Sequence, residues 1–241
     1  MTEDPIKLFA SRAERYPEPT EADAAQGAVR VALAAVPVLG GSLTEILSMV
    51  LTPALTRRRD DWFKELAEAF ESVETKVNGF TTGDLQGNEL FVSAAIQATR
   101  AAISTHQEEK RAALRNALVN IALGRAPQED QVQMFLRYVE ELTTWHLRVL
   151  RFFQSPANHL AAKGLRSEYM MGGGAQVLED MYPELRGNRE FYDQIATDLH
   201  SRGMLNSPPS FLHTSMTGSG MVAKRTTAIA DAFLAFITSP I

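Results

Sequence analysis

Apolar residues recur every three or four positions over most of the chain, which predicts a mainly α-helical protein. The clearest stripe lies on a highly charged segment that ends at Asn78-Gly79, and it consists of Trp62, Leu66, Phe70, Val73 and Val77. The same spacing predicts helices over 89–104, from His106 to just before Gly124, and over 127–154. Shorter helices are expected at 156–163, 175–182 and 188–203, and in the closing segment "TTAIADAFLAFIT".

Residues 29–51, "VRVALAAVPVLGGSLTEILSMVL", are the most apolar part of the chain and carry only two charges, Arg30 and Glu45. Pro37 and Gly40–Gly41 divide this stretch into two arms. The first arm belongs to a helix over about 20–36. The second begins with Ser42 and Glu45 at capping-box spacing and is expected to break at Pro53. Each arm falls short of the about 20 apolar residues that span a bilayer.

Two interpretations of this hairpin stay open. The favoured one is a buried hairpin at the centre of a helical bundle. The alternative is a membrane-acting effector that inserts the hairpin, with the apolar contacts made by Val38, Leu39, Leu43, Ile46 and Leu47. The cluster Arg57–Arg59 would suit anionic lipid, but Asp60 and Asp61 neutralise most of its charge.

The change in composition after Ser155-Pro156 predicts two domains, a helical bundle over 1–154 and a winged-helix-like module over 155–241. Three helices, a hairpin-like loop and a terminal helix are the element order of a winged helix. Its candidate contacts to nucleic acid or to a partner are Arg189, Arg202, Lys224 and Arg225. The expected recognition helix over 188–203 also carries three acids, so protein recognition is favoured over DNA.

Bulk composition narrows the functional classes. The 241 residues have a formal net charge of −5, which disfavours general nucleic-acid binding. The absence of cysteine excludes disulfides, thiolate metal sites and cysteine nucleophiles. The N-terminal segment lacks an apolar signal core behind a basic start, so we expect a cytoplasmic protein. No metal site and no cofactor are predicted, because no Glu-x-x-His pair, no His-Glu-x-x-His motif and no nucleophile elbow occurs. His106 and Glu109 lie on one helical face and are interpreted as a helix cap and a salt-bridge partner.

Arg100 and His106 are separated by five residues, which is similar to the Arg-x(4–6)-His motif of the HEPN ribonucleases. The resemblance implies metal-free RNA cleavage by this pair, although small apolar residues follow Arg100. His146 lies on an apolar stripe and is interpreted as a hydrogen-bonded core histidine. The glycines in "MMGGGAQVLED" lack the lysine and hydroxyl of a phosphate-binding loop and are interpreted as a flexible connector.

Residues 105–241 resemble the bacterial abortive-infection alpha family in the order of "EEKRAALRNALVNIA", "FLRYVEELTTWHLRVLRFF", "IATDLHSRGML" and "TTAIADAFLAFI". Ala228-Ile229-Ala230 stands where the family has a glycine, and a tryptophan-alanine pair is missing near Asn116. The resemblance implies a role in phage defence and carries over no catalytic residue. The preferred hypothesis is therefore a non-enzymatic interaction or sensor protein that binds a protein partner or itself.

Overall fold

The computed structural model describes residues 41–165 and 168–241, with backbone alone for 41–47, 84 and 86. The described chain is mainly helical, which confirms the predicted class, and its one small sheet has two strands of two residues each. The chain forms two compact units, one ending at His106 and one running from Gln107 to Pro240. The domain boundary predicted near residue 154 falls inside the second unit, between helices α7 and α8.

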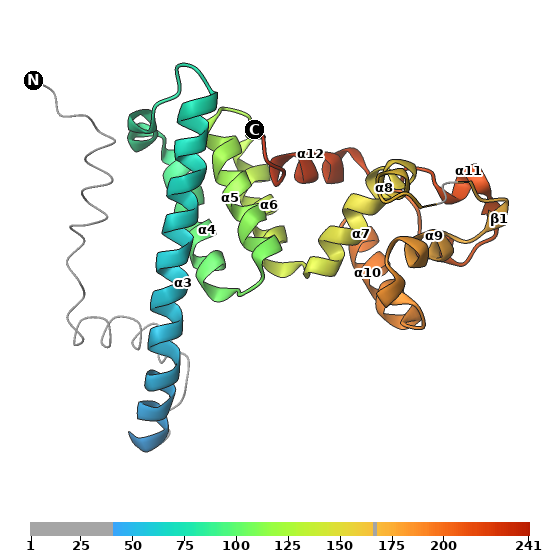
Figure 1. Ribbon diagram of the computed structural model, residues 1–241, viewed down its shortest axis with the longest axis horizontal. Helices are drawn as coiled ribbons and strands as arrows, with labels where there is room; N and C mark the ends of the chain where they lie inside the picture. Colours follow the sequence, from blue (N-terminus) through green and yellow to red (C-terminus); the bar gives the residue numbers. More distant parts are fainter. Residues whose placement is uncertain (1–40, 166–167) are drawn as a thin grey trace, which may run out of the picture. The chain divides into compact units, whose positions relative to one another are not determined.

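The first unit contains the helices α3 (Gly41–Lys76) and α4 (Glu89–Ser104), joined through a 3₁₀ turn, η1 (Thr82–Gly87). The two helices lie side by side along the C-terminal part of α3 (Figure 1). The buried Trp62 indole donates a hydrogen bond to the Thr99 hydroxyl at 3.0 Å. Four alanines of α4 are buried, and small side chains allow two helices to approach closely: Ala94, Ala98, Ala101 and Ala102.

α3 continues through Pro53, so the helix break predicted there is wrong. A proline inside a helix removes one hydrogen bond, here to the carbonyl of Met49 four residues earlier. Met49 is 74% exposed, so water can bind the carbonyl that loses its partner. The predicted helix over 20–36 and the first arm of the apolar hairpin lie outside the described residues.

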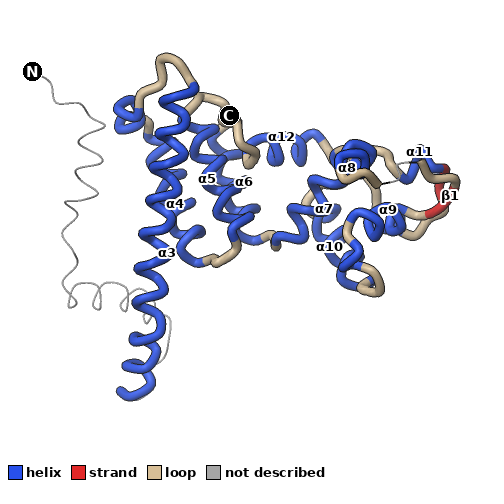
Figure 2. The backbone as a smooth tube through the Cα atoms, viewed as in Figure 1, coloured by secondary structure: helices blue, strands red, loops and turns tan. Residues whose placement is uncertain are grey.

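Helices α5 to α12 and two short strands form the second unit (Figure 2). Their bounds are α5 (Glu108–Ala122), α6 (Glu129–Glu141), α7 (Thr144–Gln154), α8 (Pro156–Ala162), β1 (Met171–Gly172), α9 (Gly174–Met181), η2 (Pro183–Leu185), α10 (Arg189–Ser201), η3 (Pro209–Leu212), β2 (Met216–Thr217), α11 (Gly218–Met221) and α12 (Ala228–Phe236).

The single helix predicted over 127–154 is wrong, because α6 ends at Glu141 and α7 begins at Thr144. Thr143 caps α7: its hydroxyl accepts from the backbone N–H of His146, whose ring nitrogen in turn accepts from the Thr143 backbone. This reciprocal pair satisfies N–H groups that a helix start leaves without partners.

α12 closes the core of the second unit. Phe233 packs edge-on against Phe135 and Tyr138 of α6, with ring centroids 5.4 and 5.8 Å apart. The carbonyls at the C-terminal end of α12 are bound by Asn120 of α5, which is only 5% exposed. The Asn120 amide nitrogen lies 2.9 Å from the Phe236 carbonyl oxygen and 3.0 Å from that of Thr238.

The three glycines at 172–174 are closely packed and do not form the flexible connector predicted for them. β1 pairs antiparallel with β2, and a Cβ at Gly173 would lie 2.2 Å from the carbonyl oxygen of Leu212. At Gly218 the corresponding distance to the Tyr169 carbonyl oxygen is 1.6 Å. Only glycine fits such approaches of backbone to backbone, so these positions fix the loops around the small sheet.

Candidate functional sites

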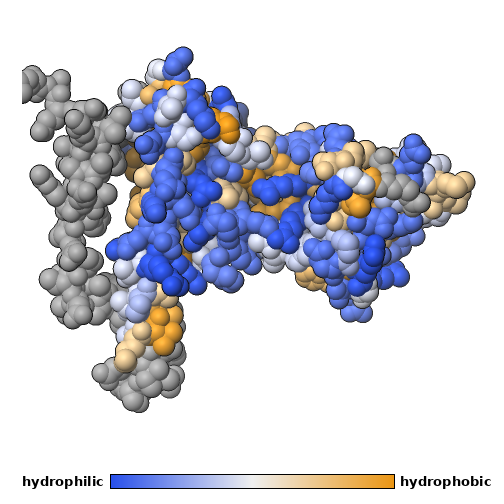
Figure 3. Space-filling model, in the orientation of Figure 1, coloured by the Kyte–Doolittle hydropathy of each residue, from blue (hydrophilic) through white to orange (hydrophobic). Residues whose placement is uncertain are grey.

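The N-terminal half of α3 extends beyond the end of α4. The Arg58 guanidinium donates to the Ile103 carbonyl at 3.3 Å, which places the last turn of α4 beside residue 58. Residues 41–56 therefore project past α4 by about 24 Å, at 1.5 Å per residue. Met49, Val50 and Leu51 are 74%, 65% and 40% exposed in this segment, and Figure 3 shows the apolar surface they contribute.

The residues predicted to enter a membrane fall largely outside the described side chains. Val38 and Leu39 precede the described chain, and Leu43, Ile46 and Leu47 are placed on α3 by their backbone alone. Among the helices of the described residues, none combines the length and the apolar character needed to cross a bilayer.

All four predicted contact cations of the second unit make internal interactions. Arg225 donates to the Gly220 carbonyl at 2.6 Å and lies over the Phe211 ring at 5.3 Å. The other three form ion pairs: Arg189 with Asp193 at 3.4 Å, Arg202 with Glu141 at 2.7 Å and Lys224 with Asp231 at 2.5 Å. Their charges are therefore largely offset within the chain, which leaves little basic surface for phosphates.

Arg100 and His106 are both exposed side chains of the first unit. Arg100 lies near the C-terminal end of α4 and His106 two residues beyond it. The ribonuclease hypothesis built on this pair stays a prediction. It requires RNA cleavage without metal that is lost in His106→Ala.

His146 has the structural role predicted for it. The ring is 8% exposed, and its two nitrogens lie 2.7 Å from the Thr143 hydroxyl and 3.3 Å from a carboxylate oxygen of Asp198. Burial lowers the pKa of His146 below its usual value, and the hydrogen bond that its Nε2 donates to the Asp198 carboxylate opposes this effect without reversing it. The neutral ring therefore belongs to the α7 cap and to the contact between α7 and α10.

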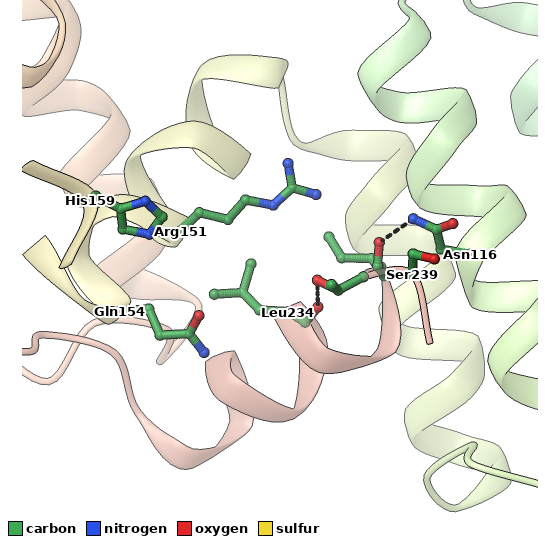
Figure 4. A pocket seen from close by; sticks show the side chains of 8 residues that line it. Asn116, Arg151, Gln154, His159, Leu234 and Ser239 are labelled. Carbon is green, nitrogen blue, oxygen red and sulfur yellow. Dashed lines mark hydrogen bonds between the residues drawn. The ribbon is translucent and has the colours of Figure 1, made fainter. Parts of the chain in front are cut away.

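A polar hollow of about 300 Å³ lies within the second unit between α5, α7, α8 and the end of α12. Leu234 and Ile237 supply its apolar lining, and Asn116, Arg151, Gln154, His159, Thr238 and Ser239 its polar lining. In Figure 4 the Arg151 side chain reaches across this hollow, with His159 and Gln154 on one side and Asn116 and Ser239 on the other. Sequence reasoning missed Arg151 because its neighbours here are distant in sequence.

Other polar groups of the hollow are held in place by hydrogen bonds. The Asn116 amide donates to the Ile237 carbonyl at 3.1 Å, and the Gln154 amide donates to Asp231 at 3.1 Å. The Thr238 hydroxyl donates to the Leu234 carbonyl at 2.7 Å. Over the part of the chain that the structure describes, no group of His, Asp and Glu side chains has the arrangement of a metal site. The hollow therefore presents a fixed polar lining around one cationic side chain.

No family model matches the chain, and no curated protein or solved structure matches it significantly.

Proposed function

We propose that this chain is a non-enzymatic interaction protein that self-associates through the N-terminal half of α3. The observation that carries the proposal is the exposure of Met49, Val50 and Leu51 on a helix that extends beyond α4. Exposed apolar side chains on a helix gain free energy by packing against another apolar surface, at roughly 25 cal/mol for each Å² removed from water.

A second copy of the chain is the partner that fits this segment best. Two copies of one helix can pair about a twofold axis, with the same surface used on both sides. A twofold-related pairing brings the exposed apolar side chains of Met49, Val50 and Leu51 in the two copies together. The apolar surface on both sides of the contact is thus supplied by the chain itself.

Sedimentation velocity over a range of protein concentrations tests self-association. Val50→Asp places a carboxylate in the centre of the dimer, and we expect association to weaken by about 2–3 kcal/mol, roughly 100-fold. Ala67→Asp adds the same charge to an exposed position of α3 beside α4 and should leave association unchanged. A wild-type chain that stays monomeric at all concentrations, or a Val50→Asp chain that dimerises normally, would reject the proposal.

A membrane-acting effector is the second candidate, favoured by the three arginines 57–59 directly after the exposed apolar segment. It predicts that the detergent-free protein floats with anionic vesicles and releases an enclosed dye, and that Val50→Asp abolishes both effects. Flotation without a dimer in solution would favour this candidate over self-association.

The second unit is proposed to be the recognition module of the protein, with a winged-helix-like arrangement over 155–241. The short β1–β2 pair, the isolated bridge between Leu205 and Thr226, and α10 between them in sequence support this proposal. The internal ion pairs of Arg189, Arg202 and Lys224 favour a protein partner over DNA. The resemblance to the abortive-infection alpha family supports a role in phage defence, which phage plating on cells with and without the protein would test.

A further inference from the structure

Among the described residues of the second unit, the hollow around Arg151 is where an arginine faces a lined cavity without an acidic partner. Across the described residues, no hydrogen bond or ion pair engages the Arg151 guanidinium. Most other arginines of this unit bind a carboxylate or a carbonyl oxygen; Arg148, one turn earlier on α7, forms a bidentate pair with Glu109. Arg137 also has no such partner in the described chain, but it lies exposed on the surface of α6.

We propose that this hollow binds a small molecule through an oxyanion headgroup, a phosphate or a carboxylate, with Arg151 as its counter-ion. The guanidinium carries five N–H donors in a planar fork that matches the paired oxygens of these groups. Arg151 reaches across the hollow from the last turn of α7 (Figure 4), where it is partly buried, so its guanidinium is placed to meet a bound oxyanion. The proposal is independent of self-association, since it concerns the other unit.

The volume and lining define the class of ligand. About 300 Å³ is at the lower end of the range for small-molecule sites, and it holds roughly ten waters at about 30 Å³ each. An inorganic phosphate fills only part of that space. A ligand with an oxyanion and a further polar portion fits better, because Asn116 and Gln154 each spend one amide hydrogen on the chain and retain the other. Leu234 and Ile237 offer apolar contact beneath it.

The side chains of the site are held rigidly enough to be a binding surface. Asn116 is fixed by the Ile237 carbonyl, and the end of α12 is fixed in turn by Asn120. Gln154 is fixed by Asp231, which also accepts from the Thr226 hydroxyl at 2.8 Å. A lining already ordered before binding loses little conformational entropy when a ligand arrives.

Isothermal titration of the full chain in a low-salt buffer tests the proposal with three probes: inorganic phosphate, acetate and adenosine monophosphate. We expect saturable binding of at least one probe, weakened at least tenfold in Arg151→Gln. Arg137→Gln removes an unpaired arginine from the exposed surface of the same unit and should bind as the wild type does. Equal affinities for phosphate and the nucleotide would assign recognition to the headgroup, and a tighter nucleotide would show that the rest of the hollow contributes.

Arg151→Lys keeps the charge without the planar fork and should bind severalfold more weakly than the wild type, while unfolding at the wild-type temperature. This variant keeps the test decisive if Arg151→Gln fails to fold, because the charge that favours the C-terminal end of α7 is retained. The proposal is overturned if the wild type binds none of the three probes, or if the folded Arg151 variants bind them as tightly as the wild type.

Discussion

Replacing Asn120 with alanine removes the amide that binds the C-terminal end of α12. That nitrogen lies within 3.0 Å of the carbonyl oxygens of Asn116, Phe236 and Thr238, so its two hydrogens are shared among three acceptors. The Asn116 carbonyl lies inside α5. The carbonyls of Phe236 and Thr238 lie at the C-terminal end of α12, where carbonyl groups have no hydrogen-bond partner within the helix.

The two lost bonds at the end of α12 set the magnitude. The bond to Phe236 is buried, and a buried carbonyl left without a partner costs about 1–3 kcal/mol. The bond to Thr238 is only partly buried, so water replaces some of it and the loss is about 1 kcal/mol. We therefore expect Asn120→Ala to lower the free energy of unfolding by about 2–4 kcal/mol.

Urea denaturation followed by circular dichroism measures this loss. With a slope of about 2 kcal/mol per molar urea, the midpoint should fall by roughly 1–2 M. Arg125→Ala is the matched comparison, because it removes a hydrogen bond to the same end of the chain, the Pro240 carbonyl, at an exposed position. That variant should lose less than about 0.5 kcal/mol. A midpoint for Asn120→Ala equal to that of Arg125→Ala would refute the argument.

Two further predictions concern pH and packing. The pKa of His146 is lowered in the folded state, so the unfolded chain binds a proton more readily and the free energy of unfolding should decrease as the pH falls below about 6.5. His146→Gln keeps a side chain suited to the α7 cap and should reduce this decrease, measured by urea titrations at pH 5.5 and 7.5. An unchanged difference between the two pH values would contradict the assignment to His146. Gly218→Ala should lower the free energy of unfolding by about 3 kcal/mol in thermal unfolding, because the new Cβ meets the Tyr169 carbonyl. Gly187→Ala should lower it by about 1 kcal/mol, because φ is +80° there but the space is open. Equal losses of stability in the two variants would show that the backbone shifts at Gly218.

The helices were predictable where the apolar period and the end signals agreed. α4, α5 and α10 lie close to their predicted ranges, because each follows a polar start and a clear apolar stripe. The break between α6 and α7 was missed because the capping box that begins at Thr143 has His146 at its third position, where a glutamate or glutamine is the usual signal. The continuation of α3 through Pro53 depends on exposure, which local sequence does not encode.

The candidate sites depended even more on contacts between distant residues. The glycines at 172–174 suggested a flexible connector. The structure shows that they are closely packed, because residues between 211 and 221 lie directly against them. One feature of the sequence could have indicated Arg151 as a site residue: it is a cation on the mostly apolar helix "TWHLRVLRFFQ". Arg148 has the same feature, yet it pairs with Glu109. Which of the two faces a cavity is decided by α12, some eighty residues further along the chain.

The bond from Asn120 to the end of α12 also has a consequence during synthesis on the ribosome. Asn120 and Thr238 are 118 residues apart, so at about 5–20 residues per second the amide waits roughly 6–24 s for its acceptor. Throughout that interval α5 and α6 lack the helix that covers Phe135, and a nascent chain in this state offers an apolar surface to chaperones. The second unit therefore completes its fold only after α12 has left the exit tunnel, however early its first helices form.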